Sequence, residues 1–130
     1  MLRIGWVMTA LVVLFLLGAS VAPKLTGAAA ALDALAALAW PSRHLLLLGV
    51  LELACVVLYA VPRTAPLGAV LLTGYIGGAI ASHLRAGSPL FTHTLFGVYL
   101  ALFAWAALLL RDPELRRYLA RRLTASRAGP

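Results

Sequence analysis

Four long apolar segments restrict the folds open to this sequence. They run over residues 4–22, 45–61, 67–84 and 90–110, and shorter stretches that carry proline, glycine or charge separate them. A helix of about 20 residues spans the hydrocarbon core of a bilayer. With 63% hydrophobic residues and only 12% charged ones, a chain of 130 residues has too little interior to hide its apolar side chains from water. The sequence therefore predicts an all-α integral membrane protein, a four-helix bundle.

The first apolar segment has an alternative interpretation. Arg3 followed by an apolar run and Ser20-Val21-Ala22 also fits a secretory signal peptide. Pro23 directly after the cleavage site disfavours that interpretation, and the run is longer than the usual apolar core of a signal peptide. We therefore expect a first transmembrane helix that is retained.

A short helix is expected in the first loop. Residues 28–39 are rich in alanine and leucine, which favour helix, but they are too few to span a membrane. Trp40-Pro41 ends this stretch, and tryptophan favours the headgroup region. The sequence thus predicts an interfacial helix that covers one end of the bundle.

The chain ends in a basic amphipathic segment. Asp112-Pro113-Glu114 is typical of a helix start. Leucines then share one face, and most of the remaining surface is basic: Arg116, Arg117, Arg121 and Arg122. We expect a four-span membrane domain over residues 1–111, and over 112–130 a cytoplasmic helix on an anionic inner leaflet with a disordered tail from residue 124.

The basic residues also predict the orientation. With four spans both termini lie on one side, and that side collects eight arginines: Arg3, Arg63, Arg111, Arg116, Arg117, Arg121, Arg122 and Arg127. The other side holds Lys24, Arg43 and Arg85. Basic loops stay in the cytoplasm, so both termini should be cytoplasmic. The formal charge of +7 points to a membrane surface as the partner, and no nucleic-acid partner is expected.

Polar residues at the other side form the candidate site. Glu52 lies within the second span, where a carboxylate is costly unless it faces the interior of the bundle and is paired. Gly49, one turn earlier, should leave room for a neighbouring backbone or a ligand. His83 and His93 flank a short turn between the third and fourth spans, near Tyr75 and Arg85.

This set of side chains permits several chemistries. Glu52 and His83 could relay protons, as catalytic groups would. Glu52, Tyr75, His83, Arg85 and His93 could bind a ligand such as a quinone head group. Two histidines and Glu52 could instead hold a metal, although their spacing is not a metal motif and we predict no metal site. Glu52 could also simply form a structural ion pair.

Small residues recur every four positions in the third span. Gly74, Gly78 and Ser82 form a ridge of the type that lets helices pack closely in a membrane. Cys55 is the only cysteine, which rules out an internal disulfide or a CxxC redox pair, and it lies within an apolar run. We predict a packing role for the ridge and leave open whether the chain is an enzyme.

Several runs together resemble the DoxX-like family of small bacterial membrane proteins. These runs are KLTG (24–27), GVLEL (49–53), YAVPRTAPLGA (59–69), LLTGYIGGAIASHLR (71–85), PLFTH (89–93) and LRDP (110–113). The positions that match the family pattern are Glu52, Pro62, Arg63, Gly74, Gly77, Gly78, His83, Arg85 and His93. Ser82 and Gly97 depart mildly from it, and Gly97 replaces an expected proline that would bend the fourth helix.

The resemblance implies a multi-pass protein of the bacterial inner membrane. The wider family is similar to a quinone-reducing membrane subunit and to membrane partners in oxidative-stress complexes. The resemblance thus implies an accessory redox subunit that binds a quinone at its outer mouth and takes electrons from a partner protein. The alternatives are an assembly protein without chemistry of its own, and a small transporter or channel that acts as a homo-oligomer.

Overall fold

The computed structural model describes residues 1–127, and every regular element in this range is helical. In chain order the elements are α1 (Leu2–Leu16), the π-helical turn η1 (Leu17–Val21), α2 (Ala22–Thr26), α3 (Ala29–Ala37), the 3-10 turn η2 (Ser42–His44), α4 (Leu45–Ala60), α5 (Ala65–Arg85), the π-helical turn η3 (Leu90–Thr94), α6 (Leu95–Arg111) and α7 (Pro113–Arg127). Four continuous helical stretches are long and apolar enough to cross a membrane: Leu2–Thr26, Ser42–Ala60, Ala65–Arg85 and Leu90–Arg111. The predicted all-α fold with four spans is confirmed.

The first span is longer than the predicted segment, which ended at Ala22. The helix continues through Pro23 and ends at Gly27, whose φ of 68° is the left-handed conformation that favours glycine. The π-helical turn η1 directly precedes α2, and Pro23 falls in the first turn of α2, where its missing N–H costs little. This extra turn carries Lys24 into the bundle.

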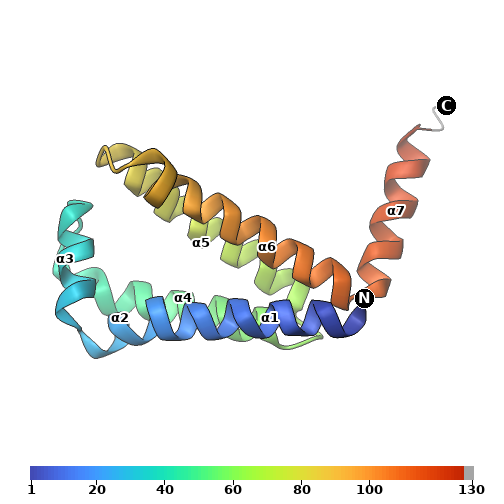
Figure 1. The fold of residues 1–130 in the computed structure, drawn as a ribbon, viewed down its shortest axis with the longest axis horizontal. Coiled ribbons are helices and arrows are strands. Elements are labelled where there is room, and N and C mark those ends of the chain that lie inside the picture. Colours follow the sequence, from blue (N-terminus) through green and yellow to red (C-terminus); the bar gives the residue numbers. More distant parts are fainter. Residues whose placement is uncertain (128–130) are drawn as a thin grey trace.

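The spans form two arms that meet at one end and diverge at the other (Figure 1). The first span and α4 lie in one arm, and α5 and α6 lie in the other. Between the arms, α1 packs on α6 and α4 packs on α5. We call the end where the arms meet the closed end and the opposite end, next to α3, the open end. The short helix α3 stands across the open end.

Two glycines allow close approach of helices at the closed end. A Cβ added at Gly5 on α1 would lie 2.8 Å from the carbonyl carbon of Leu110, and one at Gly68 on α5 would overlap the backbone of Tyr59 on α4. Around these contacts a buried apolar cluster draws on all four spans, with Val12, Val56, Leu72 and Leu108 among its members. The packed core of the protein therefore lies at the closed end.

The C-terminal helix leaves the bundle at the closed end. Asp112 Oδ1 accepts hydrogen bonds from the backbone N–H groups of Glu114 (3.0 Å) and Leu115 (2.9 Å), so it is the predicted N-cap. α7 then runs across the direction of the spans (Figure 1) and extends to Arg127. The prediction of a disordered tail from residue 124 is therefore wrong for residues 124–127, which are helical. The rest of that predicted tail, residues 128–130, lies outside the described residues.

Candidate functional site

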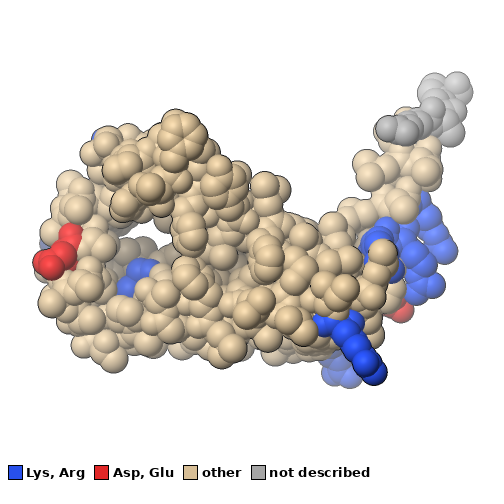
Figure 2. All heavy atoms as spheres, viewed as in Figure 1, with Lys and Arg blue, Asp and Glu red and all other residues tan. Residues whose placement is uncertain are grey.

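A cavity of about 610 Å³ lies between the two arms at the open end. All four spans and α3 contribute to its walls, which are largely apolar and include Phe15, Leu35, Phe96 and Leu100. A hollow between the arms is visible in Figure 2, with atoms of a basic side chain inside it. The volume falls within the range of about 300–1,000 Å³ that is typical of small-molecule sites.

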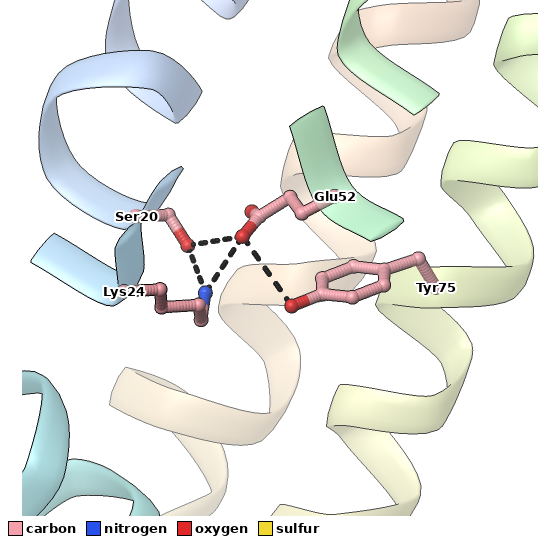
Figure 3. Close-up of polar contacts among 4 residues, drawn as sticks. All are labelled: Ser20, Lys24, Glu52 and Tyr75. Atoms are coloured by element: carbon pink, nitrogen blue, oxygen red, sulfur yellow. Dashed lines mark hydrogen bonds and ion pairs between the residues drawn. The ribbon is translucent and has the colours of Figure 1, made fainter. Parts of the chain in front are cut away.

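One buried carboxylate faces this cavity. Glu52 is 2% exposed, and it shares the buried face of α4 with Gly49, Val56 and Tyr59, so it faces the interior of the bundle as predicted. Its Oε2 atom lies 2.7 Å from Lys24 Nζ and accepts hydrogen bonds from Ser20 Oγ (3.0 Å) and the Tyr75 hydroxyl (3.3 Å). Figure 3 shows these four side chains converging from three spans. Glu52 is therefore paired, as a membrane-buried acid must be.

The local structure of the first span positions two of these partners. Ser20 lies in the π-helical turn η1, and Lys24 lies one turn later in α2, where its Nζ also donates to Ser20 Oγ. π-helical turns occur often at functional sites because they redirect side chains. A Cβ added at Gly49 would lie 2.9 Å from Lys24 Cβ. The expectation that Gly49 makes room for a neighbour is confirmed, and the neighbour is α2.

The histidines form a separate group at the cavity. The rings of His83 and His93 lie 5.6 Å apart between centroids, and both residues line the cavity wall. His83 Nδ1 pairs with Ser88 Oγ at 3.1 Å, and His93 Nδ1 pairs with Thr92 Oγ1 at 2.8 Å. Within residues 1–127 no hydrogen bond links either imidazole to Glu52. The structure thus brings the histidines together but leaves them apart from the carboxylate.

The remaining predicted site residues hold the first loop in place. Arg85 donates to the carbonyl oxygen of Leu38 at 3.0 Å, and Trp40 Nε1 donates to Ser82 Oγ at 3.2 Å. Both bonds tie the segment after α3 to the end of α5. Arg85 therefore contacts the covering loop and not the ligand space. Among the described residues no group of three or more His, Cys, Asp or Glu side chains could hold a metal ion.

The glycines of the predicted ridge face the cavity. Cβ atoms added at Gly74 and Gly78 would meet nothing within 4 Å among the described residues, and both glycines line the cavity. These two glycines therefore make no close helix contact within residues 1–127, because α5 diverges from the other arm at this level, and a packing role against another protein stays a prediction. The close helix contacts instead involve Gly5 and Gly68, at the closed end where the arms converge.

A buried cation lies at the closed end of the bundle, away from the cavity. Arg111, which the sequence analysis grouped with the arginines of the cytoplasmic side, is 6% exposed. Its guanidinium donates to the carbonyl oxygens of Tyr59 and Ala60, at the C-terminal end of α4. It also lies 4.8 Å from the ring centroid of Trp6. Arg111 therefore caps α4 and closes the bundle, while the arginines of α7 remain exposed: Arg116, Arg117, Arg121 and Arg122.

Sequence reasoning missed Lys24 and Ser20 as the partners of Glu52. Lys24 is the only lysine in the chain, which was the available signal for its special position.

A comparison with family models matches residues 7–107 to the DoxX-like family, a range that includes every cavity-lining side chain. Neither the curated proteins nor the solved structures gave a match to the chain.

Proposed function

We propose that this protein, which belongs to the DoxX-like family, binds a lipid-soluble molecule of the quinone type between its two arms. The observation that carries the proposal is the Lys24–Glu52 pair, an ion pair on the wall of a largely apolar cavity. In a membrane protein such a pair marks a candidate functional site, because its burial is costly. An apolar cavity with a few convergent polar groups is also the usual form of a ligand site.

The cavity is suited to an amphipathic ligand. Its aromatic wall includes Phe15 and Phe96, whose ring centroids lie 5.7 Å apart, and a ring with an apolar tail would contact such a surface. Lys24 has a third N–H, not used for Ser20 or Glu52, that can donate a hydrogen bond to a carbonyl oxygen. We assign proton handling at the head group to Glu52, with His83 and His93 as further polar contacts at the same cavity.

We further propose an accessory role in a membrane redox system. A partner protein that carries a redox cofactor would supply the electrons, and the cavity would present the quinone to it. The charge distribution supports an arrangement with both termini in the bacterial cytoplasm and the open end on the outer side, because most arginines gather at the closed end (Figure 2).

α7 supports a contact with the anionic inner leaflet. Leu115 packs against the core, so the stripe that continues through Leu119 and Leu123 faces the same side, which we assign to the membrane. Arg117 and Arg121 occupy the opposite face and add to the positive surface. Juxtamembrane basic residues contribute about 1 kcal/mol each near an anionic leaflet.

This placement can be measured with a fluorophore on α7. A Leu119→Cys variant in a Cys55→Ser background would carry an environment-sensitive dye in lipid nanodiscs. We expect a blue-shifted emission in discs that contain phosphatidylglycerol and a smaller shift in discs of phosphatidylcholine alone. Replacement of the four exposed arginines of α7 by glutamine should remove the difference, and an unchanged difference would contradict the electrostatic contact.

The quinone proposal is tested by ligand-dependent stability. A short-chain benzoquinone at 100 times its Kd should stabilise the purified protein by about 2.7 kcal/mol. Glu52→Gln should reduce this stabilisation, whereas Glu114→Gln, which changes an exposed acid on α7, should leave it unchanged. Two results together would contradict this proposal: the quinone does not stabilise the wild-type protein, and Glu52→Gln changes only the stability of the protein. The alternative of an assembly protein without chemistry of its own would then replace it.

A further inference from the structure

The two oxygens of Glu52 have different surroundings. Oε2 accepts hydrogen bonds from Ser20, Lys24 and Tyr75, whereas Oε1 accepts none from the described residues. Within residues 1–127, the side-chain atoms that are both fully buried and without a hydrogen-bond partner are Thr94 Oγ1 and Arg111 Nε. Oε1 is not one of them, so it is not fully buried. Since Glu52 lines the cavity, Oε1 is a free acceptor at its wall.

Lys24 has a free donor beside this oxygen. An ammonium group has three N–H donors, and two of them are used for Ser20 Oγ and Glu52 Oε2. The side chain of Lys24 is 20% exposed and also lines the cavity. Because the two oxygens of one carboxylate are adjacent, Nζ at 2.7 Å from Oε2 lies near Oε1 as well. One ligand atom can therefore reach both the free donor and the free acceptor.

We infer that the cavity selects a head group that carries a hydroxyl. The hydroxyl would donate its proton to Glu52 Oε1 and accept a hydrogen bond from Lys24 Nζ. This inference rests on the proposed function and deepens it, because a quinol has such a hydroxyl and the corresponding quinone has only carbonyl oxygens. A quinone would satisfy Lys24 and leave Oε1 without a partner.

The expected preference follows from the strength of the added bond. A hydrogen bond to a charged group contributes about 1.5–3 kcal/mol, and 1.4 kcal/mol corresponds to a tenfold change in affinity. The quinol should thus bind at least about tenfold more tightly than the quinone. The dimethyl ether of the quinol keeps the ring and the tail but has no hydroxyl proton, so it too should bind at least about tenfold more weakly than the quinol.

The experiment compares three probes on the full-length protein in nanodiscs without oxygen. The probes are a short-chain benzoquinol, the corresponding benzoquinone and the dimethyl ether of the quinol, and Kd is measured for each. In Glu52→Gln the preference for the quinol should fall to within about threefold, because an amide oxygen is a weaker acceptor than a carboxylate. Glu114→Gln serves as the matched control and should retain the full preference.

The outcomes separate this inference from the function on which it rests. Equal affinities for quinol and quinone, or tighter binding of the quinone, would overturn the hydroxyl selection and leave the proposed cavity function standing. If none of the three probes binds the wild-type protein, the proposed function itself fails. Should Glu52→Gln not fold, the double variant Lys24→Gln/Glu52→Gln leaves no unpaired charge, and it too should lose the preference.

Discussion

Lys24 Nζ lies 2.7 Å from Glu52 Oε2, and this ion pair joins the end of the first span to the second. The two residues meet because the first helix continues one turn past Pro23 and because Gly49 lets α2 approach α4. The pair lies toward the open end, where the two arms diverge and the cavity lies between them. It therefore holds together the part of the bundle that the apolar core does not reach.

Removal of one partner of this pair should destabilise the protein more than removal of both. Lys24→Met leaves the carboxylate of Glu52 without a counter-charge, and loss of one partner from a buried pair costs about 3–5 kcal/mol. Because Lys24 is partly exposed to the cavity, we expect about 3 kcal/mol. Thermal unfolding in detergent measures the loss.

Two further variants give this comparison its control. In Lys24→Met/Glu52→Gln both charges are gone, so at least half of the lost stability should return. Arg63→Met removes an exposed cation in the turn between α4 and α5 and should have little effect. If Lys24→Met unfolds at the same temperature as the wild type, the ion pair does not stabilise the bundle.

Two glycines of α5 should respond oppositely to alanine. At Gly68 the added methyl group would overlap the backbone of Tyr59, so α4 and α5 must separate, and overpacking of this kind costs about 1–3 kcal/mol or more. At Gly74 the methyl group meets nothing, and alanine favours helix over glycine by about 1 kcal/mol. Unfolding midpoints of Gly68→Ala and Gly74→Ala measure the difference. A loss of oligomer or complex in Gly74→Ala would instead point to a docking role for this ridge.

The number and the approximate bounds of the spans could be predicted because each is a continuous apolar segment bounded by charge, glycine or proline. The end of the first span could not be predicted. Pro23 normally indicates a helix boundary, and the π-helical turn that accommodates it leaves no mark in the apolar sequence around Ser20. The four-residue spacing of Gly74 and Gly78 predicted helix packing, but the divergence of the arms decides which glycines are in contact.

The candidate site was predictable in part. Glu52 stood out because it is a carboxylate within an apolar segment, and the cost of exposing a charge to lipid correctly predicted that it faces the interior of the bundle. Its partners depend on which helices are neighbours and on how far each one extends, and neither follows from local sequence. For the same reason Arg111, at the end of an apolar run, resembled the exposed arginines that follow it although it is buried.

Replacement of Arg111 should weaken the closed end of the bundle. Arg111→Met removes the hydrogen bonds to the carbonyl oxygens of Tyr59 and Ala60, which then have no donor at the end of α4. Hydrogen bonds to a charged group contribute about 1.5–3 kcal/mol each, so the loss of two such bonds should lower the unfolding free energy by about 3–6 kcal/mol. Arg111→Lys should recover only part of it, because an ammonium has no planar fork and stacks less well on Trp6. Arg121→Met, on the exposed face of α7, is the control, and an equal loss there would show that the effect is one of net charge.

The carboxylate and the histidines should act independently on ligand binding. No hydrogen bond within the described residues joins His83 or His93 to Glu52, although all three line one cavity. Changes at sites without shared partners add to within about 0.3–0.5 kcal/mol. The losses in quinol binding energy for Glu52→Gln and His83→Gln, measured by titration in nanodiscs, should therefore sum to the loss in the double variant. A coupling of more than about 1 kcal/mol would show that the bound ligand, or a water molecule, links the imidazole to the carboxylate, and the two groups would then form one proton-handling unit.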